Sequence, residues 1–106
     1  MSFRYKVEYC NNKDVVTIHF DVQVCEGSAL GHDRNSPLIL KDLQEMHGIK
    51  DVSGRRYEIR LEKGAIFEWS ELLPSIISLL KKHLGKVKGE DGEDKKLRRA
   101  VKFDGE

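Results

Sequence analysis

The chain has 106 residues, of which 39% are apolar and 35% are charged, which is typical of one small globular domain. Its 19 lysines and arginines nearly balance its 18 acidic residues, so no overall field marks it as a binder of nucleic acid or membrane surfaces. No apolar run reaches the roughly 18 residues of a membrane span, and MSFRYKVEY lacks the apolar stretch of a signal peptide. We therefore expect a cytoplasmic protein, a monomer or weak dimer, with free thiols at its two cysteines.

Alternation at the start of the chain predicts a β-hairpin. Apolar and polar residues alternate over residues 3–10 and again over residues 16–24, on either side of the polar turn at residues 11–14. Cys10 and Cys25 both fall in the polar phase of this pattern. Both thiols are therefore expected to point away from the core.

The middle of the chain predicts a loop, a short helix and a second hairpin. Residues 26–35 show no periodicity and form the loop. Ser36 is the expected N-cap, Pro37 the first helical residue and Gly48 the left-handed end of the helix. Residues 49–52 and 57–61 then predict two strands around a turn at residues 53–54.

An amphipathic helix is predicted over residues 69–84, with a broad apolar stripe and Gly85 as its end. Pro74 lies near the edge of the first turn, so we expect an irregular start, with the proline setting the angle at which the helix crosses the sheet. Trp69, at the junction of strand and helix, is expected to be buried against the sheet.

The predicted order is β-β-α-β-β-α, a two-layer α/β (α+β) sandwich with two helices on an antiparallel sheet. This domain takes in residues 1–85. Residues 86–106 carry successive acidic and basic blocks with few apolar side chains, which predicts a disordered charged tail.

Five short motifs in this order give the chain a family resemblance over roughly residues 5–84. It resembles the N-terminal domain of the Nfu (NifU-like) iron–sulfur cluster scaffold proteins. The matching pieces are NNKDVVTIHF (11–20), Ser36-Pro37-Leu38, GIKDV (48–52), the strand 57–61 and WSELLP (69–74).

The resemblance implies the two-layer fold and a role accessory to iron–sulfur cluster assembly. In that family a Cys-x-x-Cys pair in a separate C-terminal domain holds the cluster, and this sequence contains no such pair. The turn also lacks the family's proline-rich form. We therefore expect a non-enzymatic protein-interaction module with no cofactor or cluster site of its own, with Asn12 and Trp69 as candidate partner-binding residues.

Other chemistry has weaker support. Cys10, Cys25, His19 and His32 are candidate metal ligands, but their spacings match no compact ligand motif, which favours free thiols and solvated histidines. No cysteine or serine has a base and an orienting group at a supporting spacing, so we do not expect an enzyme.

The alternative function is a ligand- or nucleic-acid-binding sandwich that uses its exposed strand face and basic tail. Arg55, Arg56 and Arg60, with Tyr57, could contact phosphates on that face. Alternating Glu58 and Glu62 reduce the field there, which favours a solvated strand face.

The tail contains one short docking pattern. Arg99, Val101 and Phe103 form an Arg-x-Val-x-Phe sequence between basic residues and an acid, similar to the peptide that type-1 protein phosphatases recognise. An extended segment of this kind would add to a sheet edge, with Val101 and Phe103 in apolar pockets. The alternative is a tail that only aids solubility.

Overall fold

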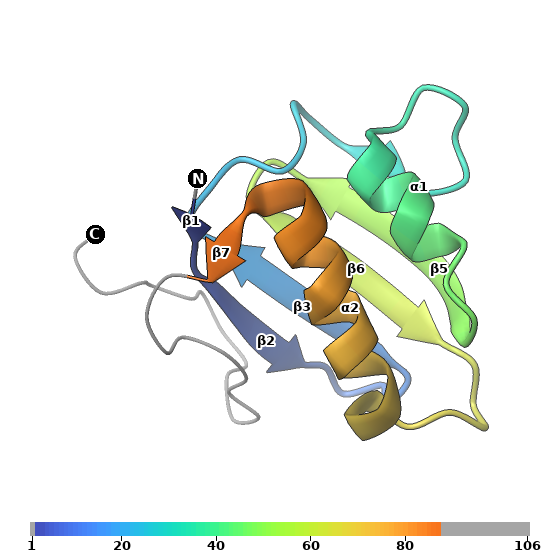
Figure 1. Ribbon diagram of the computed structural model, residues 1–106. Helices are drawn as coiled ribbons and strands as arrows, with labels where there is room; N and C mark the ends of the chain where they lie inside the picture. The colour runs from blue at the N-terminus through green and yellow to red at the C-terminus, as the bar shows by residue number, and fades with distance from the viewer. Residues whose placement is uncertain (1, 88–106) are drawn as a thin grey trace.

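The computed structural model describes residues 2–87 and contains a five-stranded antiparallel sheet and two helices (Figure 1). Across the sheet the strands run in the order β2-β3-β6-β5-β4. In chain order the elements are β1 (Ser2–Phe3), β2 (Tyr5–Tyr9), β3 (Val15–Phe20), β4 (Ala29–Leu30), α1 (Leu38–Gln44), β5 (Ile49–Arg55), β6 (Glu58–Lys63), α2 (Trp69–Leu84) and β7 (Lys86–Val87).

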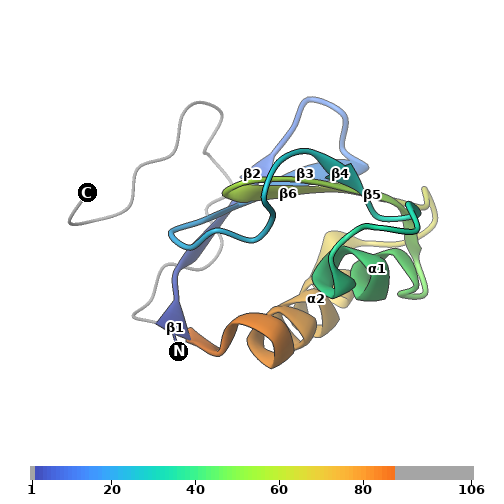
Figure 2. The same ribbon diagram turned by 90° about the horizontal axis from the view of Figure 1, so that it is seen from above.

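Both helices lie on the same face of the sheet, and the opposite face is bare among the described residues (Figure 2). Buried side chains from β2, β3, β5 and β6 meet those of α1 and α2 in one core. The predicted α+β class is confirmed, although the predicted order lacks the two-residue strands β1, β4 and β7. Within residues 2–87, neither helix combines the length and apolar character needed to cross a bilayer.

The first predicted strand is broken at Arg4. Its backbone N–H donates to Asp21 Oδ1 at 2.6 Å instead of continuing the ladder. Phe3 therefore belongs to β1, which pairs in parallel with β7. The expected domain boundary after Gly85 leaves β7 out, and residues 88–106 of the predicted tail lie outside the described residues.

The predicted orientation of Cys25 is wrong. β3 ends at Phe20, and the chain then leaves the ladder, with the Val24 N–H donating to the carbonyl of Arg56 at 2.7 Å. Once the ladder ends, the period of two no longer assigns faces, and both Val24 and Cys25 are buried in the core. The following loop also contains β4, a short edge strand that pairs with β5.

The second hairpin turns at Arg56 and Tyr57, not at Ser53 and Gly54 as predicted. β5 continues through Gly54, where Leu40 of α1 packs directly onto the backbone: a Cβ at this position would lie 2.9 Å from Leu40 Cδ1. The glycine is therefore needed for close approach of helix and strand, and it does not mark a turn.

α1 begins one residue later than predicted. Pro37 is itself the N-cap, with ψ at 149°, and no side chain caps the helix. The helix ends at Gln44, and Gly48, with φ at 95°, completes the turn into β5.

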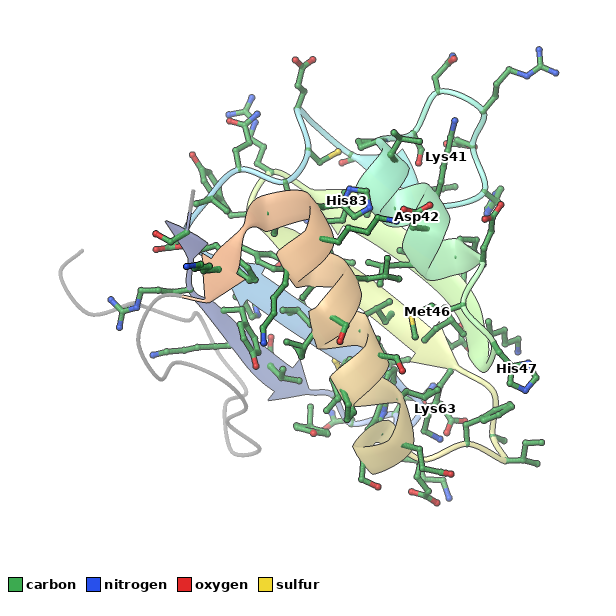
Figure 3. All side chains as sticks on the ribbon, in the orientation of Figure 1. Lys41, Asp42, Met46, His47, Lys63 and His83 are labelled. Atoms are coloured by element: carbon green, nitrogen blue, oxygen red, sulfur yellow. The ribbon has the colours of Figure 1, made fainter. Side chains whose placement is uncertain are left out.

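α2 has the predicted bounds, but its start is regular. Glu68 and Glu71 form a reciprocal capping box, which satisfies amide groups of the first turn. Pro74 is exposed on the side away from the sheet, and its effect on the crossing angle stays a prediction. Near the other end of α2, His83 Nε2 lies 2.7 Å from Asp42 Oδ2 of α1, so this pair links the two helices (Figure 3).

Candidate interaction surface

The β2–β3 turn is built around Asn12. The Asn12 side-chain oxygen accepts a hydrogen bond from the Asp14 N–H at 2.9 Å, and its carbonyl accepts one from the Val15 N–H at 3.0 Å. Asparagine favours turns because its side chain can replace a backbone acceptor in this way. The rest of the Asn12 side chain is exposed to solvent.

Trp69 fastens this turn to the start of α2. Its side chain is buried, with 6% exposed, which confirms the predicted burial. The indole Nε1–H donates to the carbonyl of Lys13 at 2.9 Å across 56 residues of sequence. Trp69 thus has a role in holding the turn, and its buried ring offers little surface to a partner.

A second link runs from the turn to the end of β6. The Lys63 ammonium donates to Asp14 Oδ1 at 2.9 Å, and the Lys63 N–H donates to the Asp14 carbonyl at 2.8 Å. The hydrogen bond from Lys63 lowers the pKa of Asp14 below its ordinary value, helped by the positive charges of Lys63, Lys13 and Lys50. Lys63 is only 4% exposed, and the Asp14 carboxylate is its ion-pair partner.

The loop of residues 64–68 lies beside the turn and is held at several points. The Gly64 N–H donates to the Gly48 carbonyl at 2.9 Å, and the Phe67 N–H donates to the Gly64 carbonyl at 3.1 Å. The Phe67 ring packs edge-on against His47, with centroids 5.1 Å apart. Ile66, between these fixed points, is 87% exposed and is the most exposed large apolar side chain within residues 2–87.

We call the turn 11–14 and the loop 64–68 together the turn end of the domain. Figure 3 shows Lys63 and His47 at this end, near the start of α2. Between the two segments is a hollow of about 450 Å³. It is lined by Tyr9, Cys10, Lys13, Lys63, Ala65, Glu68, Trp69 and Ser70.

The candidate metal ligands do not come together. Cys25 is buried in the core, whereas Cys10 is half-buried, with its sulfur 3.8 Å from Thr17 Oγ1. His32 lies 3.8 Å from Asp51, at an exposed position. Among residues 2–87, no three His, Cys, Asp or Glu side chains are placed to hold a metal ion.

His19 instead lies between two carboxylates on the bare face of the sheet. Its Nε2 is 2.8 Å from Glu8 Oε1, and its Nδ1 is 3.6 Å from Glu58 Oε2. Both ring nitrogens therefore face acidic side chains.

Sequence reasoning pointed to Asn12 and Trp69 but missed Lys63 and Ile66. Lys63 follows Ile59 and Leu61 in the inward phase of β6, which is the signal that could have placed it at the core. Ile66 lies outside any periodic segment and gave no such signal. Arg99, Val101 and Phe103 lie outside the described residues.

No family model, no curated protein and no solved structure matches this chain.

Proposed function

We propose that the protein is a non-enzymatic protein-binding module that contacts its partner through the turn end. The observation that carries this proposal is Ile66, an 87% exposed isoleucine on a loop whose backbone is fixed on both sides. A single exposed apolar residue is ordinary on a protein surface. Ile66 is a suitable anchor for a partner because its loop is fastened and the preceding residue, Ala65, lines the hollow.

The fastening matters because binding normally loses free energy through the ordering of loops and side chains at the interface. Here the Trp69 contact with Lys13 and the Lys63 contact with Asp14 hold the two segments in place before any partner arrives. The partner can therefore use its contact with Ile66 and the hollow for affinity, with little lost to ordering this chain.

The proposed partner class is the set of proteins that assemble iron–sulfur clusters in the cytoplasm. Support comes from the motif resemblance: the Asn-rich turn and the Trp-x-x-Leu-x-Pro segment, far apart in sequence, meet at the turn end through the Trp69 hydrogen bond. In this proposal the chain binds an assembly protein and holds no cluster itself.

Isothermal titration calorimetry of the full chain with purified iron–sulfur assembly proteins of its source organism tests the proposal. Ile66→Ser should weaken binding by about tenfold or more, because it removes the central apolar anchor. Leu38→Ser is the matched control, since Leu38 is 68% exposed at the start of α1, away from the turn end. It should leave the affinity unchanged.

Circular dichroism melts of both variants check that each remains folded. Equal weakening by Ile66→Ser and Leu38→Ser would contradict the turn end as the contact surface. Failure of every assembly protein to bind would contradict the partner class.

A further inference from the structure

The bare face of the sheet has a hollow of about 430 Å³ over β3, β6 and β5. Arg60 stands at its centre in the strand register, directly opposite Thr17 of β3 on one side and Ser53 of β5 on the other. Arg55 is a diagonal neighbour of Arg60 across β5 and β6, a separation that long side chains can span. The lining of this hollow therefore includes two guanidinium groups and two hydroxyl groups, together with the carboxylates of Glu8 and Glu58 and the Cys10 thiol.

Acidic residues on this face have cationic or histidine neighbours. His19 lies within 4 Å of both Glu8 and Glu58, Lys50 lies 3.6 Å from Glu62, and His32 lies 3.8 Å from Asp51.

The arginines on this face, in contrast, have no carboxylate partner within residues 2–87. Arg55 stands opposite Glu58 in the ladder, yet Glu58 reaches toward His19 on the other side. Within residues 2–87, neither Arg55, Arg56 nor Arg60 forms an ion pair with a carboxylate. Glu8 and Glu58 line the hollow together with the arginines, but both carboxylates lie within 4 Å of a His19 ring nitrogen.

We propose that this hollow binds the phosphate group of a small phosphorylated ligand. Guanidinium groups bind phosphate oxygens through paired N–H donors, and these charge-assisted hydrogen bonds are stronger than neutral ones. The Thr17 and Ser53 hydroxyls add two donors beside Arg60. A tetrahedral dianion can accept from all four groups, whereas a carboxylate has only two oxygens to offer.

A second hollow of about 400 Å³ adjoins the first, because Arg55 and Glu58 line both. It also contains Tyr57 and Arg56 of the β5–β6 turn and Ser28 of the loop before β4. The Tyr57 side chain is about half exposed and offers an aromatic surface there. The organic part of the ligand would extend from the phosphate toward this ring.

The test is an NMR titration of the full, ¹⁵N-labelled chain with inorganic phosphate and with adenosine monophosphate at fixed ionic strength. Saturable shifts are expected at the amides of Thr17, Ser53 and Arg60. Arg60→Gln should weaken binding by about tenfold or more, since it removes a charge-assisted contact. Arg34→Gln is the matched control, because Arg34 is an exposed arginine in the loop before α1, outside the hollow, and it should leave binding unchanged.

The two probes separate two sources of the same chemistry. Tighter binding of the mononucleotide, lost in Tyr57→Ala, identifies an organic phosphate, and equal binding identifies free phosphate; both support the site. Absence of saturable shifts, equal weakening in Arg34→Gln, or shifts centred on Lys81 and Lys82 of α2 would overturn it. A single-stranded oligonucleotide that binds with steep salt dependence while both small probes fail would also overturn it.

Discussion

The two faces of the central sheet are made by the same strands and have opposite characters. On the helix-covered face Ile18, Ile59 and Leu61 are fully buried. Their immediate neighbours Thr17 and Arg60 lie on the bare face, where hydroxyl and charged groups meet solvent. The comparison teaches that alternate residues of one strand can stabilise the core while the residues between them stay on the surface, where they can contact a ligand.

The sharpest test of this comparison uses two adjacent residues of β6. Ile59→Ala should destabilise the domain by about 2–5 kcal/mol, because it leaves a cavity in a packed core. Arg60→Ala should change stability by less than about 0.5 kcal/mol, as surface substitutions usually do. Urea denaturation followed by circular dichroism measures both, and comparable losses would break the distinction between the faces.

A substitution at Trp69 applies the same comparison of buried and exposed residues to the turn end. Trp69→Phe keeps an aromatic ring but removes the N–H that the Lys13 carbonyl accepts. The loss of this bond and of packing volume should reduce stability by about 1–3 kcal/mol. In the unchanged protein the fluorescence of Trp69 should be blue-shifted and protected from iodide. A water-like emission maximum in the folded chain would contradict the buried indole.

A substitution at Gly48 tests whether packing on the helix-covered side of the sheet also constrains the backbone. Its φ is 95°, and a Cβ there would lie 2.8 Å from Leu72 Cδ2. Gly48→Ala should therefore cost about 1–2 kcal/mol, partly from strain and partly from displacement of Leu72. Gly27→Ala is the control, because no atom lies within 4 Å of a Cβ at that position. Thermal melts of the two variants should differ clearly, and equal melting temperatures would refute the constraint.

Asp14 gives the smallest expected effect, since its carboxylate is partly exposed to solvent. Its pKa is lowered in the folded state by the hydrogen bond from Lys63. A lowered folded pKa means that the pair stabilises the protein above the unfolded value of about 3.9 and that this stability is lost as the pH falls through the folded pKa. Asp14→Asn should therefore be less stable than the unchanged chain at pH 7, with the gap closing in acid.

The Lys63→Met background provides the control for this pH dependence. Without the ammonium group, Asp14→Asn should no longer remove a favourable charge pair, so urea midpoints measured across the pH range should shift in parallel. A gap that still closes in acid would assign the effect to another group.

Long periodic segments were predictable from the sequence, and close tertiary contacts were not. The bounds of α2 follow from an apolar stripe over 16 residues, and the first hairpin follows from its alternation. The turn assigned to Ser53 and Gly54 is wrong because Gly54 serves the approach of Leu40, a contact that no local pattern reveals. Cys25 was misplaced because the ladder ends at Phe20 while the alternation in sequence continues.

The candidate surfaces were likewise only partly predictable from the sequence. Motif resemblance pointed to Asn12 and Trp69, and the structure brings their segments together. The exposure of Ile66 depends on the conformation of its loop, and the contact of Glu58 with His19 depends on side-chain conformations. Neither can be derived from local sequence patterns. Residue order alone shows the charges on β6 but not which of them have partners.

The parallel pairing of β1 with β7 puts Ser2 opposite Lys86 and Phe3 opposite Val87. Residues 2–87 therefore enter and leave the fold at neighbouring points. A unit with this geometry can be grafted into a surface loop of a host protein without pulling its ends apart, and its ends can be joined by a short linker to make a circular permutant opened elsewhere. Within residues 2–87, the two-stranded β1–β7 sheet thus makes insertion into a host protein and circular permutation geometrically feasible.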